Sequence, residues 1–536
     1  MGVIVAHGKR PLTKESGRKG ERIHEAGQNA VAFVGLCCFA VIGSLRRYPP
    51  PPPPPPPEGA SSDVVSAPAP QGPDAQAGGA ARGYTLIAEV CEYNPRVTAI
   101  AIEYDKELQL AVDLVDRYEV SALLNAVSTY AGEELSDSIQ PKAPREIVKA
   151  YTSDGPNVGV MKKGNYVILE LDPYDENASS VYLGYSYIPE GGEKGQSKEI
   201  LPYGDKMVYE IRQTLPIKYS DGGLTSTGDT FQQAGYQTQI VDDFTQHVYE
   251  SETPGLTYKK LAYNLYQPEA EEGETYPLIV FLHGSGSRSN NLDGHDETLS
   301  PLYNNQGGIT WVKNAPEPAY VFVPQYFDYP DVTTNSINWS HPDVTTMTME
   351  LVRQFVDDPS MKIDPNRIYI SGLSIGGRGS WTFLRNPAYS DYFAGALIMC
   401  GSGGVTAWDV ITDEELAQLK AVRASGLPVW LHHNDTDPTV PVEGSRNAYK
   451  VMLNIPLDDP MPNPTVETED YRYYESADGK IKYTELKFKP DQVNENLGIY
   501  TPVGHWVWEN TFKDKAAIAW LFEQNLQNRA PTVFPN

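Results

Sequence analysis

The stretch YISGLSIGGRGSW, residues 369–381, constrains the fold of this chain more than any other feature. Its first half is β-branched and aromatic, which predicts a strand, and its second half places glycines around Ser374 where a helix begins. Glycines two positions before and two positions after the serine leave room for an abrupt turn from strand to helix. Such a turn exposes the Ser374 hydroxyl and points the amide of Ile375 into the same space. Ser374 is therefore the predicted nucleophile; the alternative is a glycine-rich turn with an incidental serine.

From residue 235 onward, short apolar runs alternate with amphipathic segments. Met347, Leu351 and Phe355, for example, recur at spacings of four and predict a helix. Strands that are apolar throughout, with helices between them, predict an α/β sheet covered on both faces, over residues 235–536. Residues 470–488 read as an inserted hairpin that turns at Asp478-Gly479. The runs that predict buried strands are YPLIVFLHGSGS, AYVFVPQYF, RIYISG, FAGALIMCG and LPVWLHHN.

Residues 84–230 have a different pattern, in which short alternating strands are separated by turn residues. In VTAIAIEYDKEL the alternation places Ile100, Ile102 and Tyr104 on one face. Several such strands predict an all-β sandwich of immunoglobulin type. No residue of this domain suggests catalysis, so packing, oligomerisation or positioning is its expected role, with carbohydrate binding a weaker option. A homo-oligomer remains open.

The first 83 residues contain no pattern typical of a folded domain. Residues 1–47 are a basic leader with an apolar run at 30–45, closed by Arg46 and Arg47, which predicts an export signal or a single membrane tether. The alternative is a loosely folded leader. Nine prolines at 49–57 begin a proline-rich linker over residues 48–83, which is typical of an extended spacer. We therefore expect an extracytoplasmic protein, either secreted or anchored.

Charge and motif content exclude several classes of function. The 536 residues carry a net charge of −27, which argues against nucleic acid as a partner. The four cysteines have neither the spacing of a disulfide framework nor that of a metal site. The chain also lacks an H-E-x-x-H pair, a Walker loop and a G-x-G-x-x-G turn. The sequence thus implies no metal and no cofactor.

A serine hydroxyl needs a base, and on a sheet of this kind the chain order is serine, then acid, then histidine. Of the nine histidines, His505 alone lies beyond residue 440, in a loop before the last helix. His505 is therefore the predicted base; the alternative is a surface histidine beside aromatic residues.

The acid is expected after the strand LPVWLHHN. Asp437 is preferred because the proline that follows it and the VP pair beyond would stiffen its loop. Its role would be to orient the imidazole and to stabilise the imidazolium. Asp435 is the second candidate, more typical of a loop-capping residue, and Glu443 is the third.

An oxyanion needs hydrogen-bond donors, and the FLHGSGS loop after an earlier strand offers free backbone amides. The amide of Ser285 is expected to pair with that of Ile375; the alternative is a plain strand-end turn. His432 and His433 precede the loop that carries Asp437, which we call the acid loop. They are expected to serve packing and loop hydrogen bonds, with substrate contact as the alternative. Trp381 is expected in the core.

Together the motifs IDPNRIYISGLSIGGRGSW, PLIVFLHGSG, DPTVPV and PVGHWVW resemble bacterial esterases related to polyhydroxybutyrate depolymerases and feruloyl esterases. With the stretch VTAIAIEYDKEL near the start of the first domain, they resemble the two-domain members in which an immunoglobulin-like domain precedes the catalytic one. The resemblance covers roughly residues 84–530. It implies an α/β-hydrolase fold and ester hydrolysis by a triad that falls on Ser374, Asp437 and His505.

From the residues and the resemblance we expect a serine carboxylic-ester hydrolase that acts through an acyl-enzyme. The expected partners are short-chain or aromatic acyl esters, either small molecules or linked to polysaccharide. A serine peptidase of the prolyl-oligopeptidase kind is one alternative, because triad chemistry is common to both. An exported binding protein with an idle hydrolase fold is the other.

Overall fold

The computed structural model describes residues 81–535, apart from 92–94, 124–142, 176–180, 186–197, 203–207, 229–230, 288–298, 304–305, 327–337, 402–411, 488–492, 495–498 and 501–503. The predicted leader and nearly all of the proline-rich linker fall outside these residues. Within the described part of the chain, every helix is too short or too polar to cross a membrane.

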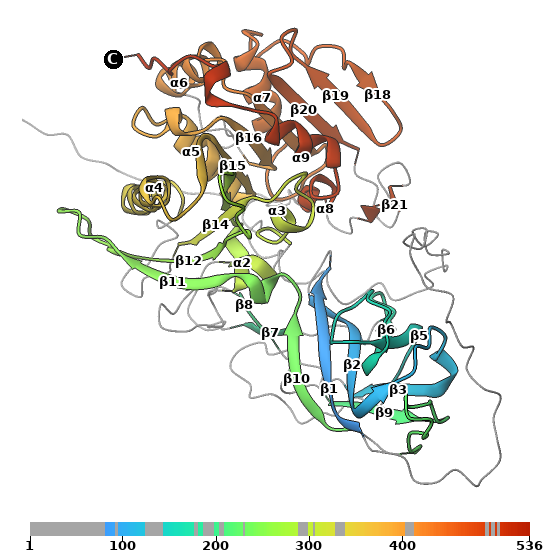
Figure 1. Cartoon of the computed structure of the whole chain (residues 1–536). Helices are drawn as coiled ribbons and strands as arrows, with labels where there is room; N and C mark the ends of the chain where they lie inside the picture. Colours follow the sequence, from blue (N-terminus) through green and yellow to red (C-terminus); the bar gives the residue numbers. More distant parts are fainter. Residues whose placement is uncertain are drawn as a thin grey trace, which may run out of the picture. The chain divides into compact units, whose positions relative to one another are not determined.

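The first described domain is built from strands (Figure 1). Their bounds are β1 (Ala81–Val90), β2 (Pro95–Leu108), β3 (Tyr118–Leu123), β4 (Ala143–Arg145), β5 (Ile147–Ser153), β6 (Gly164–Leu171), β7 (Val181–Tyr185), β8 (Lys198–Pro202), β9 (Val208–Gln213) and β10 (Gln233–Thr238). Among the described residues, one sheet has the order β10-β1-β2-β6-β5, a second has the order β4-β3-β9, and β7 pairs with β8. All of these pairs are antiparallel except β1 with β10.

The core of this domain joins the two larger sheets. Ile100, Ile102 and Tyr104 of β2 are buried in one cluster, as the alternating pattern predicts. The same cluster contains Val120 of β3 and Ile211 of β9. Residues from both sheets therefore meet in a shared apolar layer, which is the arrangement of a sandwich.

The second domain has a mixed sheet. Its strands are β11 (Thr245–Glu250), β12 (Lys260–Tyr266), β13 (Tyr276–Leu282), β14 (Tyr320–Gln325), β15 (Ile363–Leu373), β16 (Gly395–Met399), β17 (Val429–Asn434), β18 (Val466–Glu467), β19 (Tyr471–Glu475) and β20 (Ile481–Leu486). In the described residues their order is β11-β12-β14-β13-β15-β16-β17-β20-β19-β18. The six strands from β14 to β20 run parallel. Their carboxyl ends therefore share one edge, where open α/β sheets place their sites.

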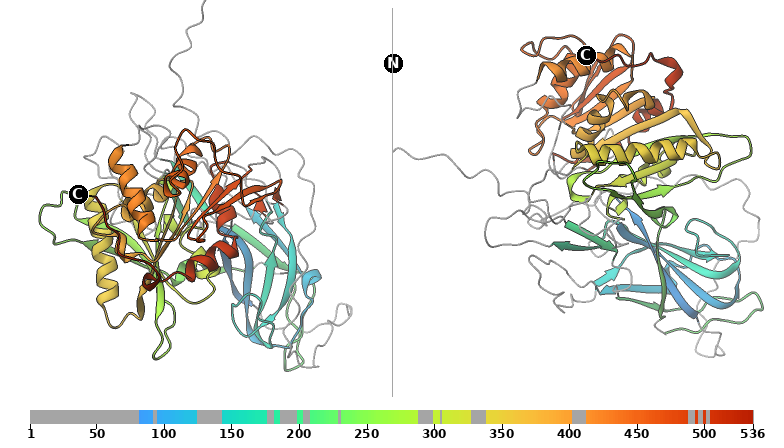
Figure 2. Two further views of the ribbon diagram at one scale, coloured as in Figure 1. Left: turned by 90° about the horizontal axis from the view of Figure 1, so that it is seen from above. Right: turned by 90° about the vertical axis from the view of Figure 1, so that its left-hand side faces the viewer.

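Helices cover both faces of this sheet, as the sequence predicts (Figure 2). They are α2 (Ser300–Tyr303), α3 (Thr310–Lys313), α4 (Pro342–Asp357), α5 (Ile375–Leu384), α6 (Asp413–Ala424), α7 (Glu443–Met452), α8 (Val507–Thr511) and α9 (Lys515–Phe522). Leu278 and Val280 of β13 share a buried cluster with residues of α4 to α7. Ile279 and Phe281 belong to a second cluster, with residues of α2, α3, α8 and α9. Because successive side chains of a strand point to opposite faces, the two clusters lie on the two sides of the sheet.

Two expectations about the chain's organisation differ from the structure. The hairpin of β19 and β20 is not an insertion, because β20 pairs in parallel with β17 and so continues the main sheet. The expected start of the second domain at residue 235 falls inside β10, which pairs with β1 and belongs to the first domain's sheet. Both differences arise from strand pairing between distant segments, which local periodicity does not encode.

Candidate active site

Ser374 lies between the last residue of β15 and the first residue of α5, in the sharp turn that the glycine spacing predicts. Its φ of 56° and ψ of −122° place it in a backbone conformation that residues with a Cβ rarely adopt. A Cβ at Gly376 would overlap the carbonyl oxygen of Leu282, and one at Gly372 would overlap the carbonyl of Gly376. The neighbouring chain therefore passes close behind the turn, and Ser374 sits at the carboxyl edge of the sheet.

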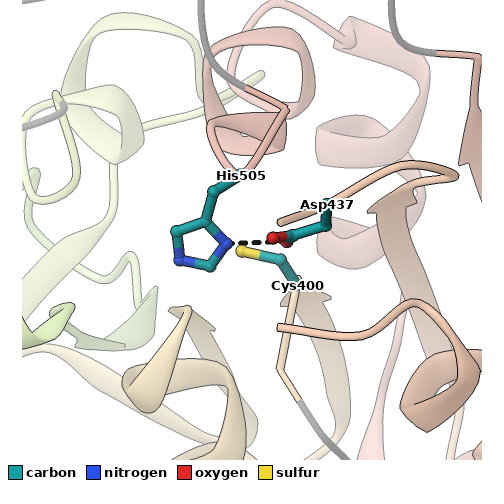
Figure 3. Close-up of side chains that lie close together, drawn as sticks. All are labelled: Cys400, Asp437 and His505. Carbon is teal, nitrogen blue, oxygen red and sulfur yellow. Dashed lines mark hydrogen bonds and ion pairs between the residues drawn. The ribbon is translucent and has the colours of Figure 1, made fainter. Parts of the chain in front are cut away.

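His505 lies just before α8 and contacts both of the other predicted triad residues. Its Nε2 is 2.9 Å from Ser374 Oγ. Its Nδ1 is 2.7 Å from Asp437 Oδ2, and Figure 3 shows this second contact. An ionised carboxylate only accepts, so Nδ1 carries the hydrogen, and Nε2 of the neutral ring accepts from the Ser374 hydroxyl. This is the tautomer that a general base requires.

Asp437 is held at both carboxylate oxygens. Its Oδ1 accepts from the amides of Thr439 and Val440 at 2.8 and 2.9 Å, and its Oδ2 accepts from His505 and, at 3.1 Å, from Nε2 of His433. Burial by itself would raise the pKa of Asp437. The hydrogen bonds from the two histidines and from Val440, with the charge of His505, outweigh burial and hold that pKa well below its usual range. The group is therefore an anion at neutral pH.

The other two candidates for the acid lie elsewhere. Asp435 is 3.6 Å from Nη1 of Arg472, and Glu443 begins α7 and lies 3.3 Å from Nη1 of Arg446. The structure brings Asp437, and neither of these, to the imidazole of His505.

Ile375 and Ser285, the predicted oxyanion donors, belong to two segments that run side by side. Ile375 is the first residue of α5, and Ser285 begins the short turn η3 (Ser285–Ser287) that follows β13. A Cβ at Gly284 would come within 3.7 Å of Ser374 Cβ, so the loop that carries Ser285 passes beside the predicted nucleophile. Donation from the Ser285 amide stays a prediction.

Cys400 also lies beside this site, although no motif in the sequence predicts a role for it. It follows β16 and is fully buried, and its Sγ lies within 4.8 Å of ligand atoms of Asp437 and His505 (Figure 3). Burial and the charge of Asp437 raise the pKa of the Cys400 thiol well above its usual value. A thiol, a carboxylate and an imidazole can together bind a metal ion. Nδ1 of His505, however, carries the hydrogen of its bond to Asp437 and so has no lone pair left for a metal. Because β15 and β16 are parallel neighbours, the position of Cys400 at a strand end was the signal available in the sequence.

The two histidines at the end of β17 make the kind of contacts that the sequence favours. His432 Nδ1 lies 2.9 Å from the hydroxyl of Thr511, and His433 bonds to the acid loop and to Ser445. Trp381 is fully buried, as expected. What sequence reasoning missed is that one partner of His433 is the predicted acid itself.

Comparison with known proteins relates both domains to esterases. Residues 83–226 match the family model described as the esterase immunoglobulin-like N-terminal domain. A poly(3-hydroxybutyrate) depolymerase from Ralstonia pickettii is 29% identical over 140 residues. That match covers 25% of this chain and 27% of the depolymerase, so it spans about a quarter of either protein.

Among solved structures, a thermostable esterase is 25% identical, covers 83% of this chain and 100% of its own, and superposes with a TM-score of 0.58. A ferulic acid esterase, 14% identical, covers 52% of this chain and 97% of its own, but its TM-score of 0.32 is too low to carry an argument. The domain match and the thermostable esterase show an esterase-type chain with an immunoglobulin-like N-terminal domain and an α/β fold. The predicted fold class is thereby confirmed.

Proposed function

We propose that the chain is a serine carboxylic-ester hydrolase in which Ser374, His505 and Asp437 form the catalytic triad. The observation that carries the proposal is the continuous line of hydrogen bonds from Ser374 Oγ through both ring nitrogens of His505 to Asp437 Oδ2. The strained backbone at Ser374 supports it, because such strain clusters at functional sites.

In the proposed reaction, Ser374 Oγ attacks the ester carbonyl carbon while Nε2 of His505 takes its proton. Asp437 stabilises the imidazolium, and the amides of Ile375 and Ser285 donate to the oxyanion. The tetrahedral intermediate collapses as His505 returns the proton to the departing alcohol, which leaves an acyl-enzyme. Water, deprotonated by the same imidazole, then attacks the acyl carbon, and Ser374 is released with the acid.

The proposed substrates are short-chain or aromatic acyl esters, as small molecules or attached to a polysaccharide. The motif resemblance supports this class, as does the partial match to a poly(3-hydroxybutyrate) depolymerase. A panel of short, long and aromatic p-nitrophenyl acyl esters tests it. A preference for long acyl chains would contradict this substrate class without affecting the triad.

The decisive experiment is labelling with a fluorophosphonate together with ester turnover. We expect the wild type to be labelled and to hydrolyse p-nitrophenyl acetate or butyrate, and Ser374→Ala to lose both while keeping its circular dichroism spectrum. An unlabelled, inactive wild type would favour the idle binding protein. Faster cleavage of peptide anilides than of esters would favour the peptidase.

We also propose that the protein acts outside the cytoplasm, either secreted or anchored. The basic leader with its apolar run supports this, as does the similarity of residues 83–226 to an esterase domain. Fractionation of cells that express the full chain tests it. Recovery of the activity solely in the cytoplasm would contradict it.

A further inference from the structure

His433 is a second imidazole on the predicted catalytic carboxylate. It lies in β17 and is fully buried. Its Nε2 is 3.1 Å from Asp437 Oδ2 and 2.9 Å from the carbonyl oxygen of Val440, and its Nδ1 is 2.8 Å from Ser445 Oγ. Every hydrogen-bonding atom of the ring therefore has a partner, and two of the three partners belong to the acid loop.

These contacts fix the tautomer of the ring. Both partners of Nε2, a carboxylate and a carbonyl, can only accept, so Nε2 must carry a hydrogen. The hydroxyl of Ser445 can donate to Nδ1, so the neutral ring satisfies all of its contacts without a second proton. His433 is thus the opposite tautomer to His505, which donates to the same oxygen of Asp437 from Nδ1.

We propose that His433 is a positioning residue for the ester hydrolysis, one that fixes the plane of the Asp437 carboxylate by donating to Oδ2. The inference rests on the proposed function, since it gives His433 a role only through the triad. With His433 in place, each carboxylate oxygen accepts two hydrogen bonds. Without it, Oδ2 keeps only the bond to His505, and the two backbone amides at Oδ1 hold the plane of the carboxylate alone.

The charged and titratable groups around His433 come from several elements. Asp437 faces it from the acid loop, and His505 and Cys400 lie on the far side of that carboxylate. In β20, Glu485 is the register partner of His433, and its charge is paired with Arg446 of α7 at 2.7 Å. Asp437 is therefore the charged group that Nε2 of His433 contacts directly, so a donor at Nε2 acts on the triad.

Two variants of His433 test the roles of its two ring nitrogens separately. Glutamine places its terminal amide near the position of Nε2 and can still donate to Asp437, whereas asparagine reaches only the position of Nδ1 and keeps the contact with Ser445. We expect His433→Asn to lower kcat on the order of 10- to 100-fold with little change in KM, as expected for a misaligned base. We expect His433→Gln, and Ser445→Ala, to stay within about threefold of wild type.

The pH profile gives a readout that a purely structural role would not move. In His433→Asn, Oδ2 loses a competing donor and becomes a stronger acceptor for the His505 imidazolium. The acid limb of kcat/KM should therefore shift to higher pH by several tenths of a unit, while His433→Gln keeps the wild-type limb. Equal kcat and equal profiles for the two variants, or lower activity in His433→Gln, would overturn the proposal.

Labelling and spectroscopy keep the result interpretable. If the wild type is neither labelled by fluorophosphonate nor active on p-nitrophenyl acetate, the proposed function fails. If the wild type is active and His433→Asn matches it, the positioning role alone fails. Should both variants unfold, ¹⁵N-histidine NMR of the wild-type protein tests the same geometry. We expect one ring whose hydrogen stays on Nε2; a ring at this position protonated only on Nδ1 would overturn the proposal.

Discussion

Nε2 of His505 lies 2.9 Å from Oγ of Ser374, although 131 positions separate the two residues in the chain. The parallel strands β15 and β17 bring the serine turn and the acid loop to one edge of the sheet. The loop before α8 then places the imidazole between them. The contact therefore depends on the sheet's topology.

Asp437→Asn should abolish most of the activity. Its amide nitrogen can donate to Nδ1 of His505, which would place the ring hydrogen on Nε2, facing Ser374, where it blocks proton abstraction. We expect kcat to fall by about 10⁴-fold, as in other triads given the wrong tautomer, measured on p-nitrophenyl butyrate.

Asp435→Asn is the matched control for that loss. It removes a part-exposed ion pair with Arg472, which is worth at most about 1 kcal/mol, and leaves the contacts of His505 intact. Activity near that of the wild type is expected. A larger loss in Asp435→Asn than in Asp437→Asn would mean that the wrong carboxylate has been assigned.

Among the inactive variants at Ser374, the one without a Cβ, Ser374→Gly, should be more stable than Ser374→Ala. At φ 56° and ψ −122°, alanine keeps the steric strain of serine, whereas glycine adopts this region freely. We expect Ser374→Gly to unfold in urea with a free energy about 1 kcal/mol higher than that of Ser374→Ala. Equal stability, or a more stable alanine variant, would indicate that this backbone stores no strain.

Gly376→Ala should disturb both the serine turn and the segment at the end of β13 that carries Leu282 and His283. The added methyl group would overlap the carbonyl of Leu282 and lie 2.7 Å from that of His283, so rigid backbone on both sides must move. We expect a loss of about 3 kcal/mol in the free energy of unfolding, together with most of the esterase activity. Gly223→Ala is the control, because its nearest neighbour is the end of the Asp221 side chain, at 3.1 Å. If the two variants are equally stable, this close approach does not constrain the fold.

Acid should weaken the fold through His432. Burial lowers the pKa of this ring to about 4 from its ordinary 6.5, although the charge of Asp514 opposes the shift. Between these two values the unfolded chain binds more protons than the folded one, so stability falls as the pH decreases from 6.5 to 4. The difference between the folded and unfolded pKa values of His432 corresponds to about 3 kcal/mol in the free energy of unfolding.

Urea unfolding of the wild type and of His432→Asn at several pH values measures this contribution. Asparagine can still form a hydrogen bond with Thr511 but does not titrate, so the stability of this variant should vary less across that window. Parallel pH dependences for the two proteins would show that His432 contributes nothing to acid sensitivity.

Local patterns were sufficient to predict the elements around the site. The glycines flanking Ser374 predict the turn, the apolar runs predict the strands, and the spacing of Met347 and Leu351 predicts α4, which the structure contains. The single histidine beyond residue 440 and the proline after Asp437 pointed to the two residues that the structure brings to Ser374.

Contacts that depend on tertiary register could not be predicted in this way. The placement of β20 beside β17 and of β10 beside β1 is set by pairing between segments far apart in the chain. The approach of Cys400 to Asp437 and the bond from His433 to the same carboxylate depend on how neighbouring strand ends are aligned. No local periodicity contains that information.

Near its carboxyl end β17 carries two adjacent histidines that leave the strand on opposite sides, one toward Thr511 of α8 and the other toward Ser445 of α7. Since a strand repeats every two residues, inserting or deleting one residue earlier in β17 would exchange the two rings. The acid loop would then face an imidazole whose own partners lie across the sheet. Natural length variation in this chain should therefore avoid single-residue changes within β17 and accumulate beyond its ends.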